Sequence, residues 1–205
     1  MGRRLNIAPT RSELLSVRRR LAFLEQGHQL LERKKELLTR LVYERLAQYR
    51  ELRSETRTLL SEAYRWLSIA TLRMSAQTIH QAGIGLTPAL EVEILARHSL
   101  GVEYPSVRAD LRPLQPVGLG GTDPSLDQTR ITLARAAVLL ARLGEAEMAL
   151  WRLLEEQRKT QKRVNALRYN IIPRYRETQR YIESVLEEEE RNTLFQLKRL
   201  QQMEI

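Results

Sequence analysis

The sequence contains no cysteine. This absence excludes disulfide bridges, zinc sites with thiolate ligands and catalytic thiols. Aromatic residues make up only 5% of the chain while charged residues make up 29%, a balance that suits long solvated helices better than a thick globular core. The chain also has neither a run of about 18 apolar residues nor an N-terminal apolar segment with a cleavage site. We therefore expect an intracellular protein whose only link to a membrane runs through a partner.

Motifs for chemistry are also missing. The glycine run Gly118–Gly121 is not followed by Gly-Lys-Ser/Thr, so it is no phosphate-binding loop. No Ser/His/Asp arrangement and no His/Glu pair with metal-ligand spacing on one helix face is present. We expect His28 to be a polar residue in a helical core and Glu187–Glu190 to be solvated or ion-paired. The sequence predicts no catalytic, cofactor-binding or metal-binding residue, and hence a non-catalytic protein.

What the sequence does have is an apolar stripe with an average spacing of 3.5 residues, which we call the first stripe. Thirteen of its seventeen positions are apolar or aromatic. This spacing predicts a helix that packs on a partner helix in a left-handed coiled coil. Seventy helical residues would extend about 105 Å at about 1.5 Å per residue. The positions are Leu14, Val17, Leu21, Leu24, His28, Leu31, Lys35, Leu38, Val42, Arg45, Tyr49, Leu52, Thr56, Leu59, Ala63, Trp66 and Ala70.

The limits of this first helix are predicted from its capping residues. Thr10 and Glu13 have the spacing of a capping box, so the helix should begin after Thr10. We expect it to continue to about Gln81, where Gly83 and Gly85 would end it by adopting the left-handed conformation. The short basic segment before it, residues 1–8, is expected to fray.

The middle of the chain, residues 83–124, has a different pattern. Residues 90–94 alternate apolar and polar side chains, which is typical of a half-buried strand. Residues 99–101 then predict a turn, and residues 102–104 predict a returning strand that ends before Pro105. A lone hairpin is marginally stable in water, so this one needs a helix or another protein to pack on. An open linker with Pro113 and Pro116 should follow it.

A second long helix is predicted from about residue 125 to Gln202, with Pro173 inside it. Because proline removes a helical hydrogen bond and clashes with the carbonyl of Tyr169, we expect a kink there. A second stripe runs along this helix and changes register near its end. Its positions are Leu133, Ala136, Leu140, Leu143, Glu147, Leu150, Leu154, Gln157, Gln161, Val164, Arg168, Ile171, Tyr175, Thr178, Ile182 and Val185.

The predicted fold class is therefore all-α: a long antiparallel two-helix left-handed coiled coil with a short β-hairpin and loop region in the middle. The expected divisions are an N-terminal helix in residues 1–82, the hairpin and linker in residues 83–124, and a C-terminal helix in residues 125–205. If positions 80 and 126 are neighbours, facing residue numbers add up to about 206. This register would place residues 18–20, three arginines, opposite the four glutamates of residues 187–190.

The formal net charge is +9, and its distribution narrows the possible partners. Residues 11–81 carry fourteen basic and eight acidic side chains, and residues 126–203 carry fifteen and eleven, whereas residues 82–125 carry three and five. The excess therefore belongs to the helices. It is compatible with ordinary coiled-coil flanks, with an acidic protein partner, or with nucleic acid.

Two stretches resemble one protein family. The first contains residues 9–15 and 27–37; the second contains residues 163–167, 171–174, 182, 186–188 and 194–199. Both are similar to the D subunit of the V-type and archaeal-bacterial A/V-type ATPases, and the order long helix, β segment, long helix also fits. The most specific part of the likeness is formed by Asn165, Ala166, Leu167, Ile172 and Pro173.

This resemblance implies a central rotor axle that couples ATP synthesis or hydrolysis to proton or sodium transport. It implies as partners the A and B subunits of a catalytic hexamer, the F subunit, and the C subunit or funnel on the membrane ring, with no direct nucleotide and no nucleic acid. The location would be cytoplasmic, peripheral to the membrane through the complex. The residues expected to contact the hexamer are Arg11, Arg18, Arg20, Arg191, Lys198 and Arg199. Those expected to face the F subunit or the funnel are Val92, Ile94, Val102 and Tyr104.

Two other functions fit the residues themselves. A basic coiled-coil scaffold needs no feature beyond the two stripes. A nucleic-acid binder needs phosphate contacts, but the sequence lacks interleaved aromatic residues and a recognition helix.

Overall fold

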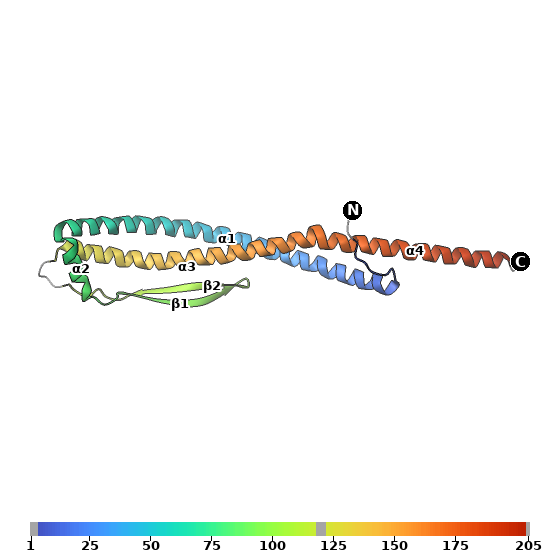
Figure 1. Cartoon of the computed structure of the whole chain (residues 1–205), viewed down its shortest axis with the longest axis horizontal. Coiled ribbons are helices and arrows are strands. Elements are labelled where there is room, and N and C mark those ends of the chain that lie inside the picture. The colour runs from blue at the N-terminus through green and yellow to red at the C-terminus, as the bar shows by residue number, and fades with distance from the viewer. Residues whose placement is uncertain (1–3, 118–121, 204–205) are drawn as a thin grey trace. The chain divides into compact units, whose positions relative to one another are not determined.

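The structure is a computed structural model that describes residues 4–117 and 122–203, without the side chains of residues 200–203. The described chain is mostly helical with one two-stranded antiparallel sheet (Figure 1). The elements are α1 (Arg11–Met74), α2 (Ala76–Ile84), β1 (Leu90–Ser99), β2 (Val102–Leu111), α3 (Pro124–Ala166), the π-helical turn η1 (Leu167–Ile171) and α4 (Ile172–Met203).

The chain forms two compact units, which we describe separately. Unit 1 contains Met1–Leu37 and Gln157–Ile205, and unit 2 contains Leu38–Glu156. The glycines of residues 118–121, part of the predicted linker, lie outside the described residues.

The first stripe is confirmed as the buried side of α1. All seventeen of its positions are buried or half-buried, although many neighbouring positions are exposed. The start of the helix is also as predicted, since the Glu13 backbone N–H donates to Thr10 Oγ1 at 3.2 Å. The left-handed sense of the coiled coil remains a prediction.

The first helix does not run unbroken to the predicted end, because it is interrupted at Ser75. Helix α1 ends at Met74, and Ser75 has φ 68°, a conformation that side chains disfavour and that breaks the helical path. Helix α2 then begins at Ala76, with the Ser75 hydroxyl accepting from the Thr78 N–H at 3.5 Å. Gly85 follows α2 with φ −92°, so its expected left-handed conformation is not adopted. The break could not be foreseen because residues 71–82 contain no glycine or proline.

The hairpin exists but is longer than predicted, because β2 continues through Pro105. Leu100 and Gly101 have φ 51° and 75°, the two positive angles of a tight I′-type turn between Ser99 and Val102. Counting from this turn, Pro105 falls at a position whose nitrogen faces away from β1. A strand can tolerate proline there because no ladder hydrogen bond is lost.

Unit 2 has its core where the hairpin packs on the helices. Val102 and Tyr104 of β2 are each 6% exposed and form one buried cluster with Leu38 of α1 and Ala149 and Leu153 of α3. The backbone N–H of Val107, which also faces away from β1, donates to Glu145 Oε2 at 3.0 Å. The predicted support for the hairpin is thus provided by this chain's own helices.

In unit 1 the proline is accommodated by a π-helical turn. The Ile172 N–H bonds to the Leu167 carbonyl five residues earlier, in place of the usual four. Proline cannot donate to the Tyr169 carbonyl, and the wider turn lets the helix pass this missing bond. The second stripe is only partly confirmed, since Leu140, Glu147 and Arg168 are exposed.

Candidate interaction surfaces

Interhelical ion pairs join the two helical segments of unit 1 at heptad intervals. On α1 the charged residues are seven positions apart, and each pairs with an opposite charge on η1 or α4. We call this set the ion-pair ladder. Its distances are 2.6 Å for Arg11–Glu190, 2.7 Å for Arg18–Glu183, 2.5 Å for Glu25–Arg176 and 4.0 Å for Glu32–Arg168.

The ladder corrects the predicted register. The first three pairs have residue numbers that add up to 201 (11 + 190, 18 + 183, 25 + 176), five less than predicted. Arg18 therefore pairs with Glu183 and not with residues 187–190, and of that run Glu190 pairs with Arg11. The predicted register assumed that positions 80 and 126 are neighbours. Position 80 is separated from the first stripe by the break at Ser75.

The π turn allows the last ion pair of the ladder, Glu32–Arg168, to form. Arg168 and Arg176 are eight positions apart, whereas their partners Glu25 and Glu32 are seven apart. A π turn contains one residue more than an α turn, so the extra position is absorbed in Leu167–Ile171. Val164 and Ile172, also eight apart, are both buried for the same reason.

The charge of Glu183 is favoured by its neighbours. The Gln179 side chain donates to Glu183 Oε1 at 2.9 Å, and Arg18 donates to the same oxygen through Nη2 at 2.7 Å. The bond from Gln179 and then that from Arg18 lower the pKa of this carboxyl below its ordinary value. Because the pairs of the ladder are exposed or half-exposed, each contributes only about 0–1 kcal/mol to stability.

The N-terminal segment lies on α4 and is not frayed as predicted, at least from Arg4 onward. The guanidinium of Arg4 is 3.9 Å from the ring centre of Tyr181, and the Leu5 N–H donates to Thr178 Oγ1 at 3.0 Å. This contact was missed because cation–π pairing of residues so far apart in sequence leaves no local pattern. Residues 1–3 lie outside the described residues.

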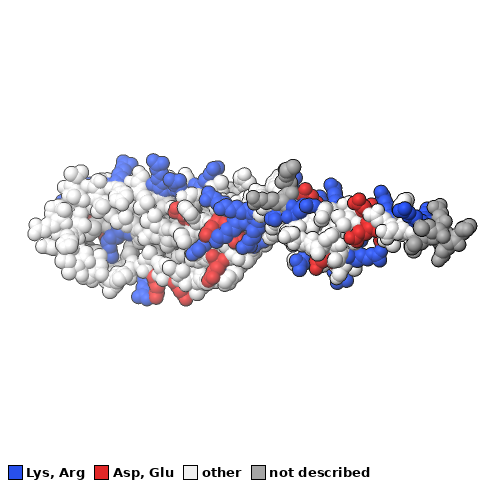
Figure 2. Space-filling model, turned by 45° about the vertical axis from the view of Figure 1, so that its right-hand side comes forward, with Lys and Arg blue, Asp and Glu red and all other residues white. Residues whose placement is uncertain are grey.

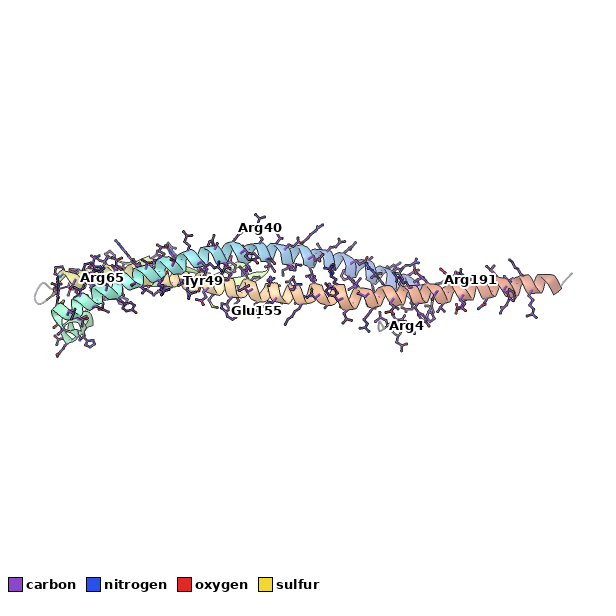
Figure 3. The ribbon with its side chains drawn as sticks, turned by 90° about the horizontal axis from the view of Figure 1, so that it is seen from above. Arg4, Arg40, Tyr49, Arg65, Glu155 and Arg191 are labelled. Carbon is purple, nitrogen blue, oxygen red and sulfur yellow. The ribbon has the colours of Figure 1, made fainter. Side chains whose placement is uncertain are left out.

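The six cations expected at a hexamer fall into two groups. Arg11 and Arg18 belong to the ion-pair ladder. The other four are exposed and form no ion pair with any residue the structure describes: Arg20, Arg191 (labelled in Figure 3), Lys198 and Arg199. Basic side chains are spread over the visible face in Figure 2 and are interrupted by acidic ones. On the face drawn in Figure 2 the two kinds of charge are therefore intermixed.

The residues of the family motif lie at the π turn. Asn165 accepts from Gln161 Nε2 at 2.8 Å, and Ala166 is the last residue of α3. Leu167 begins η1, Ile172 is buried, and Pro173 follows as the second residue of α4. The motif therefore coincides with the π turn that interrupts the α-helical geometry between α3 and α4.

The hairpin presents one apolar face outward. Opposite residues of an antiparallel pair share a face, and eight of the ten residues on one face are apolar, the other two being His98 and Glu103 near the turn. Val92 and Ile94 on this face are 45% and 68% exposed. Val102 and Tyr104 lie on the opposite face, in the core of unit 2, and their expected contact with a partner stays a prediction. The eight residues are Leu90, Val92, Ile94, Ala96, Pro105, Val107, Ala109 and Leu111.

A second exposed apolar surface lies on α3 and was not predicted. Met148 and Trp151 line an open groove beside Gly144, and Trp151 is 65% exposed. The sequence signal was present, since these residues recur at helical spacing, but they lie off the stripe that packs on α1.

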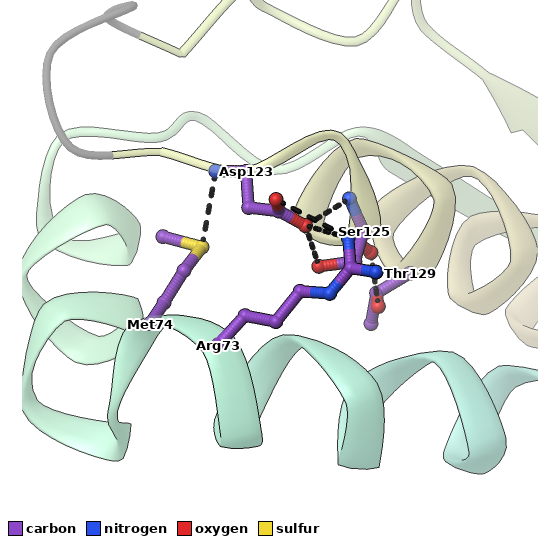
Figure 4. A network of polar contacts seen from close by, with 5 residues as sticks. All are labelled: Arg73, Met74, Asp123, Ser125 and Thr129. Carbon is purple, nitrogen blue, oxygen red and sulfur yellow. Dashed lines mark hydrogen bonds and ion pairs between the residues drawn. The ribbon is translucent and has the colours of Figure 1, made fainter.

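A polar network in unit 2 ties the end of α1 to the start of α3 (Figure 4). Asp123 caps α3 by accepting from the Ser125 N–H at 3.0 Å and from the Ser125 hydroxyl. Arg73 of α1 donates to the same carboxylate at 3.2 Å. The bonds from Ser125 and, less strongly, from Arg73 hold the pKa of Asp123 below its ordinary value. The Asp123 N–H in turn donates to Met74 Sδ at 3.2 Å.

The described residues hold no group of three or more His, Asp or Glu side chains placed for a metal ion. His28 is half-buried on the first stripe, with Nδ1 3.8 Å from Glu32. Within the same part of the chain, every helix is too short or too polar to cross a membrane.

The chain is thus a mostly helical protein whose candidate interaction sites are exposed surfaces of its helices and hairpin. Comparison with known proteins identifies its family. The sequence profile of the ATP synthase D subunit matches residues 13–202. The chain is 34% identical over 199 residues to the V-type ATP synthase D subunit of Thermotoga neapolitana, covering 97% of this chain and 98% of that protein. It is 35% identical over 204 residues to the A-type ATP synthase D subunit of Thermococcus sibiricus, covering 98% and 95%.

A third relative, the A-type ATP synthase D subunit of Pyrococcus furiosus, is 34% identical over 200 residues, which are 96% of this chain and 94% of that protein. The chain belongs to the family of ATP synthase D subunits.

Proposed function

We propose that this chain is the central rotor axle of a rotary V/A-type ATP synthase. In this role it is a non-catalytic component that couples ATP synthesis or hydrolysis, in a hexamer of A and B subunits, to transport of protons or sodium ions by the membrane part of the complex. The observation that carries the proposal is the family match, which spans residues 13–202.

The geometry of unit 1 suits an element that transmits torque. A twisting load tends to slide two paired helices past each other. The ion-pair ladder and the buried side chains between the helices, among them Val17, Leu21 and Ile182, oppose such sliding. A pair of helices is also unequal around its axis, so its rotation would present a different surface to each catalytic interface in turn.

The exposed cations near both chain ends are the proposed contacts with the hexamer. Arg20, Arg191, Lys198 and Arg199 are the better candidates, because within the described residues their charges are not engaged in ion pairs. Arg11 and Arg18 would have to give up Glu190 and Glu183 to bind the hexamer. We therefore assign them a smaller role in this contact.

The apolar face of the hairpin is the proposed contact with the F subunit or with the C subunit at the membrane ring. Val92 and Ile94 support this role, since they are exposed apolar side chains that lie on the same face of the hairpin. Val102 and Tyr104 would act indirectly by holding the hairpin on α1 and α3.

Reconstitution with the A and B subunits of the same source tests the proposal. We expect one copy of this chain per hexamer on size exclusion, and a change in the rate of ATP hydrolysis when the chain is added. Absence of association, or three or six copies per hexamer, would contradict the axle role. Association of one copy without any change in turnover would indicate a scaffold.

A pair of charge variants locates the contact. Arg20→Glu with Lys198→Glu should weaken hexamer binding, because both side chains are exposed and cationic in unit 1. Arg97→Glu with Arg142→Glu makes the same change of charge on exposed residues of unit 2 and should leave binding unchanged. Equal affinity of the two variants would contradict this placement.

A further inference from the structure

The sign of the charge on each helical segment reverses midway along the ion-pair ladder. On α1 the first two charged residues are basic, Arg11 and Arg18, and the next two are acidic, Glu25 and Glu32. Their partners on the other segment reverse at the same point. Neither chain segment therefore has a uniform charge along this side of unit 1.

An apolar seam with a heptad repeat cannot by itself exclude a slip of one heptad. A slip that lowers the facing residue numbers by seven places Leu21 opposite Tyr175, so an apolar contact is regained. The opposite slip places Leu21 opposite Glu189, so the seam itself disfavours it. Such alternative registers are excluded in coiled coils by charged or polar residues that become mismatched.

The reversal supplies this mismatch in both directions. If facing residue numbers rise by seven, Glu25 comes opposite Glu183. If they fall by seven, Arg18 comes opposite Arg176. A ladder of one polarity would lack this property, because every slipped register would again pair basic with acidic residues.

We propose that the reversal between Arg18 and Glu25 specifies the register of the two helical segments in unit 1. The π turn Leu167–Ile171 contributes to this register, since its extra residue allows Arg168 to pair with Glu32. The ladder thus excludes the slipped alignment, with Leu21 opposite Tyr175, that the apolar seam would also accept. This inference is independent of the proposed rotor role, because it concerns only how this chain pairs with itself.

The absence of native cysteine allows a direct test by disulfide trapping in the full chain. Cysteine at Leu21 with cysteine at Ile182 reports the native register, because both residues are buried in unit 1 on opposite helices. Leu21→Cys with Glu189→Cys, or with Tyr175→Cys, reports the registers slipped by one heptad in either direction. None of these positions belongs to the ion-pair ladder.

A uniform variant removes the reversal without changing the net charge. It carries Glu25→Arg, Glu32→Arg, Arg168→Glu and Arg176→Glu, so that α1 is basic and its partner acidic at every pair. We expect the unaltered ladder to form only the 21–182 disulfide under equilibrating redox conditions. The uniform variant should form the 21–175 disulfide at least several-fold more than the unaltered ladder does, while the 21–189 disulfide stays rare in both.

An alternating variant is the matched control. Arg11→Glu, Glu190→Arg, Glu32→Arg and Arg168→Glu also make four substitutions at constant net charge, but a slip of one heptad in either direction now gives only like-charged pairs. This variant should remain in the native register. If the uniform variant forms only the 21–182 disulfide, or if both variants slip equally, the reversal does not set the register and the inference is overturned.

Discussion

Arg18 and Glu183 lie 165 positions apart in the sequence, yet Nη2 of the arginine is 2.7 Å from Oε1 of the glutamate. This pair fixes which residue of α4 faces which residue of α1 in unit 1. Pairs at heptad distances on either side repeat the same alignment. The charged residues thus specify a register of the two helical segments that the apolar residues alone do not determine.

The coupling between Arg18 and Glu183 should be small and dependent on pH. A double-mutant cycle with Arg18→Ala and Glu183→Ala should give about 0–1 kcal/mol at neutral pH, because both side chains contact solvent. Since folding lowers the pKa of Glu183, this contribution is complete above the ordinary carboxyl pKa and is lost as pH falls through the folded value. Urea unfolding at several pH values measures it. A coupling that grows as pH falls would contradict this account.

The π turn should be needed for packing although its tyrosine is not. Deleting Tyr169 would remove the extra residue and turn Val164 away from the seam. Burying a valine contributes about 1.5–3 kcal/mol, and 1 kcal/mol moves Tm by about 2–4 °C in a chain of this size, so Tm should fall by at least about 3 °C. Tyr169→Ala is the control, because this side chain is exposed. Equal effects of deletion and substitution in calorimetry would refute the role of the spacing.

The two faces of the hairpin should differ sharply in their effect on stability. Tyr104→Ala should cost about 3 kcal/mol, since it removes a large side chain from the core of unit 2. Ile94→Ala should change stability by no more than about 0.5 kcal/mol, because Ile94 is exposed. Chemical denaturation compares the two variants. Similar losses would mean that the outward face is also part of the core.

The cap at Asp123 should stabilise the folded chain only while it is ionised. Asp123→Asn keeps a capping oxygen but removes the charge that faces Arg73. Because folding lowers the pKa of Asp123, the wild type should be the more stable protein above the ordinary carboxyl pKa, and this advantage should vanish as pH falls through the folded value. Thermal melts of both proteins between neutral and acid pH measure the difference. A difference that stays constant over this range would contradict the prediction.

Much of the fold could be predicted because its signals are local and periodic. The first stripe is a regular repeat, and the start of α1 and the turn before Val102 are each specified by a few neighbouring residues. The break at Ser75 could not be predicted, because serine is acceptable within a helix and residues 71–82 contain no glycine or proline.

The candidate surfaces were less predictable, since they depend on which residues face each other. The register error of five residues moved the expected partner of Arg18 away from Glu183. The hairpin residues were correctly placed on strands, but Val102 and Tyr104 needed the positions of α1 and α3 before their burial could be known. The cations of the proposed hexamer contact remain a prediction.

The rotation of this chain inside an A/B hexamer is the most direct test of the central claim. With His98→Cys as the only cysteine, a bead can be attached to the exposed end of the hairpin while the hexamer is fixed to a surface. On addition of ATP the rotor account predicts rotation in one direction with three pauses per turn, one for each catalytic interface. A bead that stays bound without turning while the hexamer hydrolyses ATP would contradict it.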